Sequence, residues 1–361
     1  MKGKVAALIG PREVEIQEFE LPKPEKGAVL TKILRSNLCG SELHIWNWAH
    51  PIIKNAVLGH EMVGEVYELG EGVESDYDGQ QVRTGDRIVA PYYVTCRKCA
   101  ACARGDFNLC QNAYRAWSQP PDKFPHFTGT FATHYYIQPD QYFYKVPDFL
   151  PSEIVAGANC ALSQVIYGIE KAGLISGETI VVQGAGGLGL YATAVAKEKG
   201  ATVIVVDAIA ERLKMAGDFG ADHLVDVSGR SSEEIVLEVN NLTRDAGADV
   251  VLEVAGVPRA FSEALAMVRG AGRVISIGNV SLGEKYEITI APGLITRKCI
   301  QVIGVVRYQP WYLKKALAFL ERTHKKIDYA KMSATEFRLE EVDDALKKAE
   351  ARTVIRGVII P

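Results

Sequence analysis

Residues 178–207, ETIVVQGAGGLGLYATAVAKEKGATVIVVD, limit the possible folds more than any other part of the chain. A short β-branched run over 179–183 predicts a strand, and a G-x-G-x-x-G turn follows it directly. A helical stretch then leads to a second predicted strand over 202–206, which ends at Asp207. A glycine motif alone is weak, but strand, turn, helix, strand and acid in this order are typical of a dinucleotide-binding unit.

The glycine turn predicts how that nucleotide is bound. Without Cβ atoms, the backbone can approach a pyrophosphate at the start of a helix. The predicted contact residues of this turn are Gly184, Gly186, Gly187, Leu188 and Gly189. Asp207 is placed to accept hydrogen bonds from the adenosine ribose and to repel a 2′-phosphate, which favours NAD over NADP. The alternative is a glycine-rich loop of an α/β sheet that binds no ligand.

Strands and helices continue to alternate after this unit. The runs HLVDV, DVVLEV and RVISIG are predicted strands, with helices between them. This alternation indicates parallel crossovers and a doubly wound sheet. The residues before about 150 contain short strands punctuated by Pro and Gly and predict a β-rich domain. The tail from about 305 holds two helices and a last strand, RGVII, and we expect it to fold back onto that first domain.

A second strong feature is CRKCAACARGDFNLC, which contains four of the seven cysteines: Cys96, Cys99, Cys102 and Cys110. In a reducing compartment such a cluster indicates a metal site rather than a disulfide framework. The spacing C-x2-C-x2-C-x7-C departs from the bacterial ferredoxin run, which continues x3-C-P. Four thiolates from one loop are typical of a closed structural zinc site, with an iron–sulfur cluster or a redox pair as alternatives.

Three further residues suggest a different kind of metal site. Cys39 lies in SNLCGSELH, His60 in VLGHEMVGEV and Cys160 in GANCALSQVIYG. Each alone is more simply a buried packing or polar residue. Together they form a Cys2His set with one coordination position open, as in catalytic zinc sites. The seventh cysteine, Cys299, is expected to be buried packing within a strand.

Bulk properties exclude several classes of partner. The 361 residues carry a formal net charge of −3, which gives no reason to expect nucleic acid or an anionic membrane. The apolar run at the N-terminus is too short for a signal peptide, and no run approaches the ~20 residues of a membrane span. The expectation is a cytoplasmic enzyme with reduced cysteines and no nucleic-acid or membrane partner.

Taken together, the chain resembles the zinc-dependent medium-chain dehydrogenase/reductase family, the zinc alcohol dehydrogenases. The resemblance covers nearly the whole length and rests on six motifs in the family's order. They are CGSELH, GHEMVGEV, TGDRIVAP, the segment 96–110 with its four cysteines (the four-cysteine lobe), CALS and GAGGLG. It implies an α/β protein with a GroES-like β-rich catalytic domain (1–154 and 305–361) and an inserted Rossmann domain (155–304). It also implies an active site in the cleft between the domains.

The resemblance assigns roles near the metal. Cys39, His60 and Cys160 would hold the catalytic zinc, and Glu61 would be a carboxylate that approaches it. The four cysteines of the lobe would hold a structural zinc, giving two per subunit. Ser41 and His44 match the residues that relay the alcohol proton. The family usually has Asp after the relay hydroxyl, where this chain has Glu42, so the support of the histidine ligand is in question.

The resemblance also assigns residues to the cofactor and the substrate. Further cofactor contacts would be Ser163, Arg212, Ala255, Gly278 and Arg356. Two aromatic pairs, Trp46 with Trp48 and Tyr92 with Tyr93, can line a largely apolar pocket, with core packing as the alternative. Trp46 and Tyr92 are the predicted pocket residues. No cationic residue stands out as an anchor for a substrate carboxylate or phosphate, although Arg115 or Arg307 could serve as one.

The expected activity is reversible NAD-dependent oxidation of a medium-sized secondary, cyclic or aromatic alcohol to a ketone or aldehyde. A polyol or threonine-type dehydrogenase of the same family is the first alternative, and a reductase acting mainly on carbonyl substrates is another. A non-catalytic scaffold that binds NAD and zinc is the alternative from a different class. The resemblance implies a homodimer or homotetramer that pairs through the sheet edge near 273–283.

Overall fold

The computed structural model describes residues 1–361, and the chain divides into two compact units. Unit 1 comprises Met1–Ser163 and Arg307–Pro361, and unit 2 comprises Gln164–Val306. Unit 2 begins nine residues after the predicted start of the inserted domain at 155 and ends two residues after its predicted end at 304. No helix has both the length and the apolar character that crossing a membrane requires.

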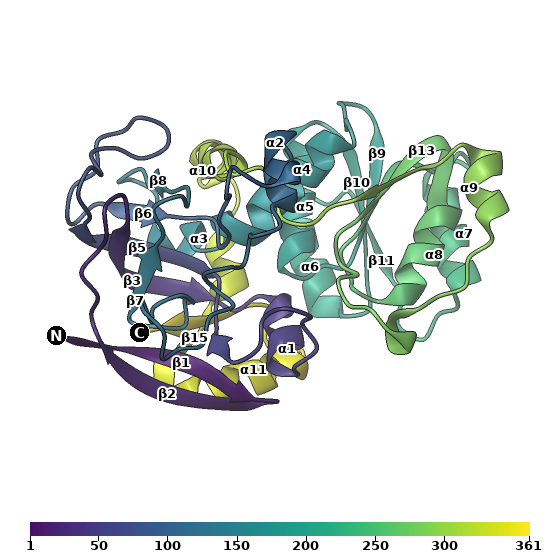
Figure 1. Cartoon of the computed structure of the whole chain (residues 1–361). Helices are drawn as coiled ribbons and strands as arrows, with labels where there is room; N and C mark the ends of the chain where they lie inside the picture. The colour runs from purple at the N-terminus through teal and green to yellow at the C-terminus, as the bar shows by residue number, and fades with distance from the viewer. The chain divides into compact units, whose positions relative to one another are not determined.

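Unit 1 is built on two sheets (Figure 1). The larger has the order β15-β16-β3-β5-β6-β8, with β7 also paired to β3. Its strands are β3 (Val29–Asn37), β5 (Glu61–Leu69), β6 (Arg87–Val89), β7 (His134–Ile137), β8 (Tyr144–Lys145), β15 (Thr335–Arg338) and β16 (Gly357–Ile360). The smaller has the order β2-β1-β4, from β1 (Lys2–Gly10), β2 (Glu13–Glu20) and β4 (Ala56–Val57).

The tail folds back onto the first part of the chain, as predicted. Strand β16 pairs antiparallel with β3, with Val358 opposite Asn37 and Ile359 opposite Ser36. The helices of this unit are α1 (Gly40–Trp46), α2 (Ala100–Ala103), α3 (Ser152–Val155), α10 (Tyr312–Thr323) and α11 (Val342–Glu350). Helix α11 is amphipathic, with Val342, Ala345 and Leu346 buried in the same core as Phe337 and Ile359. A stripe with this spacing can cover one face of a sheet while its charged face meets water.

Unit 2 is a six-stranded parallel sheet with the order β11-β10-β9-β12-β13-β14. The strands are β9 (Thr179–Gln183), β10 (Thr202–Asp207), β11 (His223–Asp226), β12 (Ala248–Glu253), β13 (Val268–Ser276) and β14 (Gln301–Gly304). Numbered from β9, this is the 3-2-1-4-5-6 order of a dinucleotide-binding sheet. The predicted doubly wound sheet is therefore confirmed.

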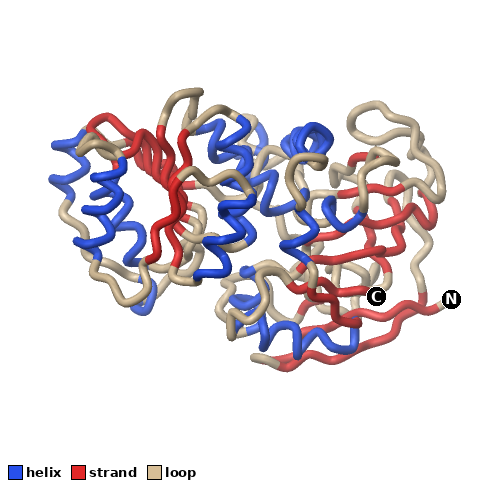
Figure 2. Tube along the Cα trace, turned by 180° about the vertical axis from the view of Figure 1, so that it is seen from behind, coloured by secondary structure: helices blue, strands red, loops and turns tan.

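Helices cover both faces of this sheet, as Figure 2 shows. They are α4 (Ser163–Lys171), α5 (Gly187–Glu198), α6 (Ala210–Asp218), α7 (Ser232–Leu242), α8 (Pro258–Met267) and α9 (Pro292–Lys298). The strands are buried on both sides, since the consecutive residues Ile180, Val181 and Val182 of β9, whose side chains alternate between the two faces, are each 0% exposed. Continuous apolar strands of this kind need covering on both faces.

Two predictions in this region are wrong. Cys299 is not buried in a strand: it is exposed and ends helix α9 in the left-handed conformation, with φ of 52°. The strand at 273–276 is not the sheet edge, because β13 lies between β12 and β14. The edge strand on that side is β14, which begins two residues after Cys299 because the chain must first leave the helix.

Candidate functional site

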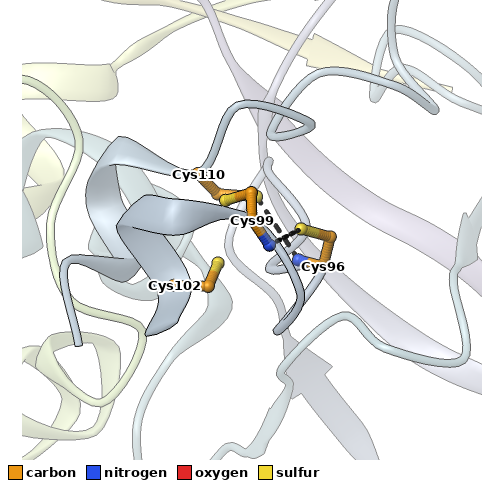
Figure 3. A group of neighbouring side chains, drawn as sticks. All are labelled: Cys96, Cys99, Cys102 and Cys110. Atoms are coloured by element: carbon orange, nitrogen blue, oxygen red, sulfur yellow. Dashed lines mark hydrogen bonds between the residues drawn. The ribbon is translucent and has the colours of Figure 1, made fainter. Parts of the chain in front are cut away.

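The four cysteines of the lobe converge in unit 1 (Figure 3). The sulfur atoms of Cys96, Cys99, Cys102 and Cys110 all lie within 4.8 Å of one another. Backbone amides support two of them: Cys99 N donates to Cys96 Sγ at 3.4 Å, and Cys96 N donates to Cys110 Sγ at 3.3 Å. Such donors stabilise thiolates, the form that binds metal.

Local turns bring these sulfurs together. Arg97 adopts a left-handed conformation with φ of 56°, and Gly105 has φ of 85°. Between them the short helix α2 carries Cys102, and a 3₁₀ turn over Phe107–Leu109 leads to Cys110. Four thiolates with no other ligand type fit the closed site of a structural zinc.

The second cluster joins three distant segments of unit 1. Cys39 precedes helix α1, His60 directly precedes β5, and Cys160 lies in a π-helical turn, η2 (Ala158–Leu162); Glu61 is the first residue of β5. Their ligand atoms also lie within 4.8 Å of one another, and all four residues are buried. The His60 Nε2 to Cys160 Sγ distance is 3.2 Å. The structure therefore brings together the three predicted ligands and the predicted carboxylate.

The question raised by Glu42 is answered by its contacts. Its Oε1 pairs with His60 Nδ1, and its Oε2 accepts from Cys39 N at 2.9 Å. Glu42 is 0% exposed, so both contacts are shielded from water. A carboxylate on Nδ1 fixes the ring so that Nε2 faces the sulfurs. The longer side chain thus supports the histidine and braces the first cysteine as well.

Glu61 is the most unusual carboxylate of the chain. It is 0% exposed, its Oε1 pairs with Arg356, and its Oε2 is buried without a hydrogen-bond partner. Burial raises the pKa of Glu61 to about 8, although Arg356 opposes this shift. A buried acceptor left unpaired is costly unless something else satisfies it.

The two thiols of this cluster shift each other's pKa. A hydrogen bond from Cys160 holds the pKa of Cys39 well below its usual range, and the same contact raises the pKa of Cys160. Two thiols, an imidazole nitrogen and a carboxylate oxygen converge on one buried point, and a cation would neutralise them. The donor set therefore fits zinc bound by Cys39, His60 and Cys160, with Glu61 beside it.

Unit 2 contains the glycine turn at the end of β9. Gly184 has φ of 102°, and a Cβ there would lie 3.0 Å from Ala255 Cα. A Cβ on Gly189 would lie 1.7 Å from Gly184 O, so only glycine allows helix α5 to pack this closely. A Cβ on Gly186 would meet nothing within 4 Å, so the start of α5 is open for a ligand.

Known proteins resemble this chain over both of its units. Residues 25–148 match the family model of the alcohol dehydrogenase GroES-like domain, and residues 187–322 match that of the zinc-binding dehydrogenase. An L-threonine 3-dehydrogenase of Pyrococcus horikoshii is 37% identical over 306 residues, 82% of each chain. A sorbitol dehydrogenase of Bacillus subtilis is 31% identical over 351 residues, 96% of this chain and 93% of that one.

Among solved structures, an alcohol dehydrogenase of Thermotoga maritima superimposes with a TM-score of 0.93 at 26% identity and covers all of both chains. The chain belongs to the zinc-dependent medium-chain dehydrogenase family. Its predicted class of reaction, zinc-dependent oxidation of an alcohol with a nicotinamide cofactor, is confirmed at the level of the family.

In this dehydrogenase, aromatic rings lie against His60, the buried histidine predicted to bind zinc. Tyr92 meets His60 edge-on with ring centroids 4.8 Å apart, and Trp117 lies 5.2 Å from His60. Tyr114 stacks at 6.5 Å from Tyr92. Trp46 was also predicted to line the pocket, but it is 0% exposed and packs in the core under Arg12, 3.8 Å from the ring centroid. Trp46 is therefore a core residue.

The other predicted residues of the dehydrogenase are placed as follows. Ser41 and His44 both lie on helix α1, three residues apart and partly exposed. Ser163 is buried and donates to Ala158 O at 2.6 Å. Arg356 is 4% exposed and pairs with Glu61, so it is not an open guanidinium; its contact with a cofactor phosphate stays a prediction.

At the carboxyl edge of the unit 2 sheet, Asp207 Oδ2 accepts from Ala185 N at 2.6 Å and thereby holds the glycine turn. Arg212 lies in the first turn of helix α6, which follows Asp207. Ala255 and Gly278 lie in the loops after β12 and β13. The roles of all four in cofactor binding stay predictions.

Sequence reasoning missed two groups in the dehydrogenase. Glu253 is 0% exposed at the end of β12 and accepts from Gly256 N and Asn279 Nδ2, each at 2.8 Å, so it ties together the loops that contain Ala255 and Gly278. Asn159, beside Cys160, donates to His60 O at 3.0 Å and to Ala90 O at 2.8 Å. An acid ending an apolar strand was a usable signal for Glu253, but nothing in the sequence indicated the partners of Asn159.

Proposed function

We propose that this dehydrogenase reversibly oxidises an alcohol to a ketone or aldehyde, with NAD as cofactor and one of two zinc ions at Cys39, His60 and Cys160. The observation that carries the proposal is the buried Cys2His set with its neighbouring carboxylate, whose Oε2 has no hydrogen-bond partner. Three protein ligands leave a coordination position for substrate, as in catalytic sites, whereas the lobe offers four thiolates and is closed.

A zinc ion at this site would supply a Lewis acid that makes the alcohol hydroxyl more acidic and polarises the carbonyl of the product. The chain's own residues must hold that site in shape. Glu42 keeps His60 Nδ1 occupied, and Glu61 offers a carboxylate oxygen that can approach the open side. The surrounding burial excludes bulk water, which strengthens these electrostatic interactions.

We propose that Ser41 and His44 move the alcohol proton. Residues three apart on a helix are neighbours on one face, so Ser41 and His44 lie on the same side of α1, and the proton would pass between them by way of the cofactor ribose. Ser41 follows the ligand Cys39 by two residues and would receive the proton first. His44, partly exposed, would release it.

For the cofactor, we propose NAD bound at the glycine turn of unit 2, where it would accept the hydride. The open start of α5 at Gly186 suits the pyrophosphate. The negative charge of Asp207 at the end of β10 would repel a 2′-phosphate. We expect Asp207→Ser to raise the use of NADP relative to NAD, by about tenfold or more if one charge repulsion is removed.

For the substrate, we propose a medium-sized secondary, cyclic or aromatic alcohol. The rings of Tyr92, Tyr114 and Trp117 beside His60 support this, because aromatic surfaces suit apolar substrates. A polyol or threonine-type substrate is the second candidate, and the relatives named as threonine and sorbitol dehydrogenases favour it. Arg307, whose guanidinium carbon lies 4.8 Å from the Tyr114 ring centroid, is the better candidate to anchor a substrate carboxylate, because Arg115 already pairs with Asp140.

The test is NADH formation by the purified, zinc-loaded protein over ethanol, cyclic secondary alcohols, benzylic alcohols, sorbitol and threonine, with NADP in parallel. Preference for bulky apolar alcohols with NAD is the expected result. Turnover restricted to sorbitol or threonine would keep the zinc chemistry and refute the apolar pocket. Binding of zinc and NAD without turnover of any alcohol or carbonyl partner would favour a non-catalytic scaffold.

We also propose a cytoplasmic homo-oligomer that pairs through edge strand β14. Val302 in this strand and Val306 just after it are 44% and 43% exposed, and an unpaired strand edge with apolar side chains is a template for pairing. Six of the seven cysteines lie in clusters that can hold metal, and cysteines used in this way are typical of proteins in a reducing compartment. Light scattering on a size-exclusion column measures the oligomeric state, and a monomer would refute this part of the proposal.

A further inference from the structure

The buried ligand Cys160 lies in a π-helical turn that needs support from outside. In η2, Leu162 N donates to Gly157 O at 3.3 Å, closing a five-residue turn. Such a turn is less favourable than an α-helical one and occurs mostly at functional sites. Carbonyl groups that a regular helix would satisfy internally must then find other donors.

Two hydroxyl groups supply those donors. Ser163 Oγ donates to Ala158 O at 2.6 Å, and the Tyr308 hydroxyl donates to Asn159 O. Tyr308 is 0% exposed, and burial raises its pKa well above the usual range, so the phenol keeps its proton. The side chain of Asn159 in turn holds His60 O and Ala90 O. The Tyr308 hydroxyl therefore fixes the residue that joins the turn of Cys160 to the strand of His60.

The residues on either side of Tyr308 bind the four-cysteine lobe. Arg307 Nε donates to Asn108 O at 2.6 Å, and Gln309 Nε2 donates to Gly105 O at 3.0 Å. Phe107 N returns a hydrogen bond to Gln309 Oε1 at 3.2 Å. Three consecutive residues thus connect both cysteine clusters, and we call residues 307–309 the strut. All of these contacts lie within unit 1.

We propose that Tyr308 is a positioning residue for Cys160. We also propose that, through the strut, the cluster of Cys39, His60 and Cys160 (the buried cluster) retains its metal only when the four-cysteine lobe is ordered. The inference rests on the proposed function, because it assumes zinc at Cys39, His60 and Cys160. Groups that orient metal ligands through hydrogen bonds tune metal affinity even where they never touch the ion. Tyr308 acts one step further out, on the backbone that carries the ligand.

The test compares Tyr308→Phe with a matched control, Tyr136→Phe. Tyr136 is 1% exposed in the same unit, and its hydroxyl accepts from Glu25 N at 2.9 Å, away from either cluster. The readouts are the rate at which a zinc chelator removes the metal from the buried cluster, and the absorption spectrum after Co²⁺ replaces that zinc. We expect about tenfold to hundredfold faster release and altered Co²⁺ bands in Tyr308→Phe only.

A second variant keeps the proposal testable if Tyr308→Phe fails to fold. Gln309→Met removes the three hydrogen bonds of Gln309 with Gly105 O, Phe107 N and Asn108 Oδ1 of the lobe and leaves Tyr308 in place. We expect faster zinc release from Cys39, His60 and Cys160 in this variant too. Release rates and spectra equal to wild type in both variants would overturn the strut. Equal changes in Tyr136→Phe would also overturn it, since the effect would then be general destabilisation. A wild-type protein with metal in the lobe and none at Cys39, His60 and Cys160 would instead refute the proposed function.

Discussion

The two cysteine clusters of unit 1 are built in opposite ways. The four-cysteine lobe comes from fifteen consecutive residues, and its sulfurs accept hydrogen bonds from the lobe's own backbone. The cluster of Cys39, His60 and Cys160 comes from three distant segments, and its partners are side chains: Glu42 on His60, and Glu61 with Arg356. The first cluster can form wherever its loop folds, whereas the second exists only when the larger sheet and η2 are in place.

This difference suits the lobe to a structural role and the cluster of Cys39, His60 and Cys160 to a catalytic one. Thiolates that already fill four positions give a metal no room for substrate. The acidic and basic residues of the lobe, Arg97, Lys98, Arg104 and Asp106, are exposed or only partly buried. The buried cluster places a carboxylate with an unpaired oxygen beside three ligands. Perturbed, buried acids of this kind are typical of functional sites rather than of structural ones.

The largest effect is expected from removing a ligand of the buried cluster. His60→Ala should lower turnover by about 10³-fold or more, since the Lewis acid contributes several kcal/mol to the transition state. Metal analysis should show the zinc content falling from two ions per chain to one. Full turnover in a variant shown to lack that zinc would contradict the assignment of the two clusters.

Removing a ligand of the lobe should act on stability first. Cys110→Ser should unfold the lobe and lower the free energy of unfolding of the protein by several kcal/mol. The reason is that binding of a structural zinc is coupled to folding of the loop that holds it. Calorimetry with and without added zinc measures this, with His60→Ala as the matched variant that keeps the lobe loaded. A Cys110→Ser protein that melts like wild type and retains both ions would show that the lobe needs no closed four-thiolate set.

The sequence predicts the lobe more directly than the buried cluster, because the lobe is local and the buried cluster joins distant segments. The spacing of the lobe is visible within one loop, and the strand–glycine–helix unit before Asp207 is equally local, so both were predictable from short patterns. The ligand set of the buried cluster was indicated only by adding up three weak signals. The links of Asn159 with His60 and of Tyr308 with η2 join residues far apart in the chain, and no local pattern encodes them.

Trp46 and Cys299 were mispredicted for a related reason. Trp46 lies next to motif residues, yet the side of α1 that it occupies faces the core. Cys299 lies next to an apolar strand, but helix α9 ends at that residue and leaves it exposed. Proximity in sequence to a strand or motif does not determine which way a side chain faces at the end of an element.

A smaller effect is expected at Glu42. Glu42→Gln should lower the zinc affinity of the buried cluster by about 10- to 100-fold, because the neutral amide orients His60 but no longer increases its basicity. Competition with a chelator measures this, and the lobe should keep its zinc. Glu42→Asp keeps the charge but is too short to make both contacts, with His60 and with Cys39 N, so an intermediate affinity is expected. Wild-type affinity in Glu42→Gln would show that geometry alone holds the histidine.

The smallest effect tests whether these two clusters account for all the metal. Cys299 belongs to neither cluster, and its left-handed φ of 52° suits glycine better than cysteine. Cys299→Gly should retain both zinc ions and full turnover. Relief of the left-handed strain, about 1–2 kcal/mol, exceeds the cost of glycine's extra freedom in the unfolded chain, about 0.5–1 kcal/mol, so unit 2 should become slightly more stable. Urea unfolding measures that gain, and loss of a zinc ion would mean that the exposed thiol binds metal after all.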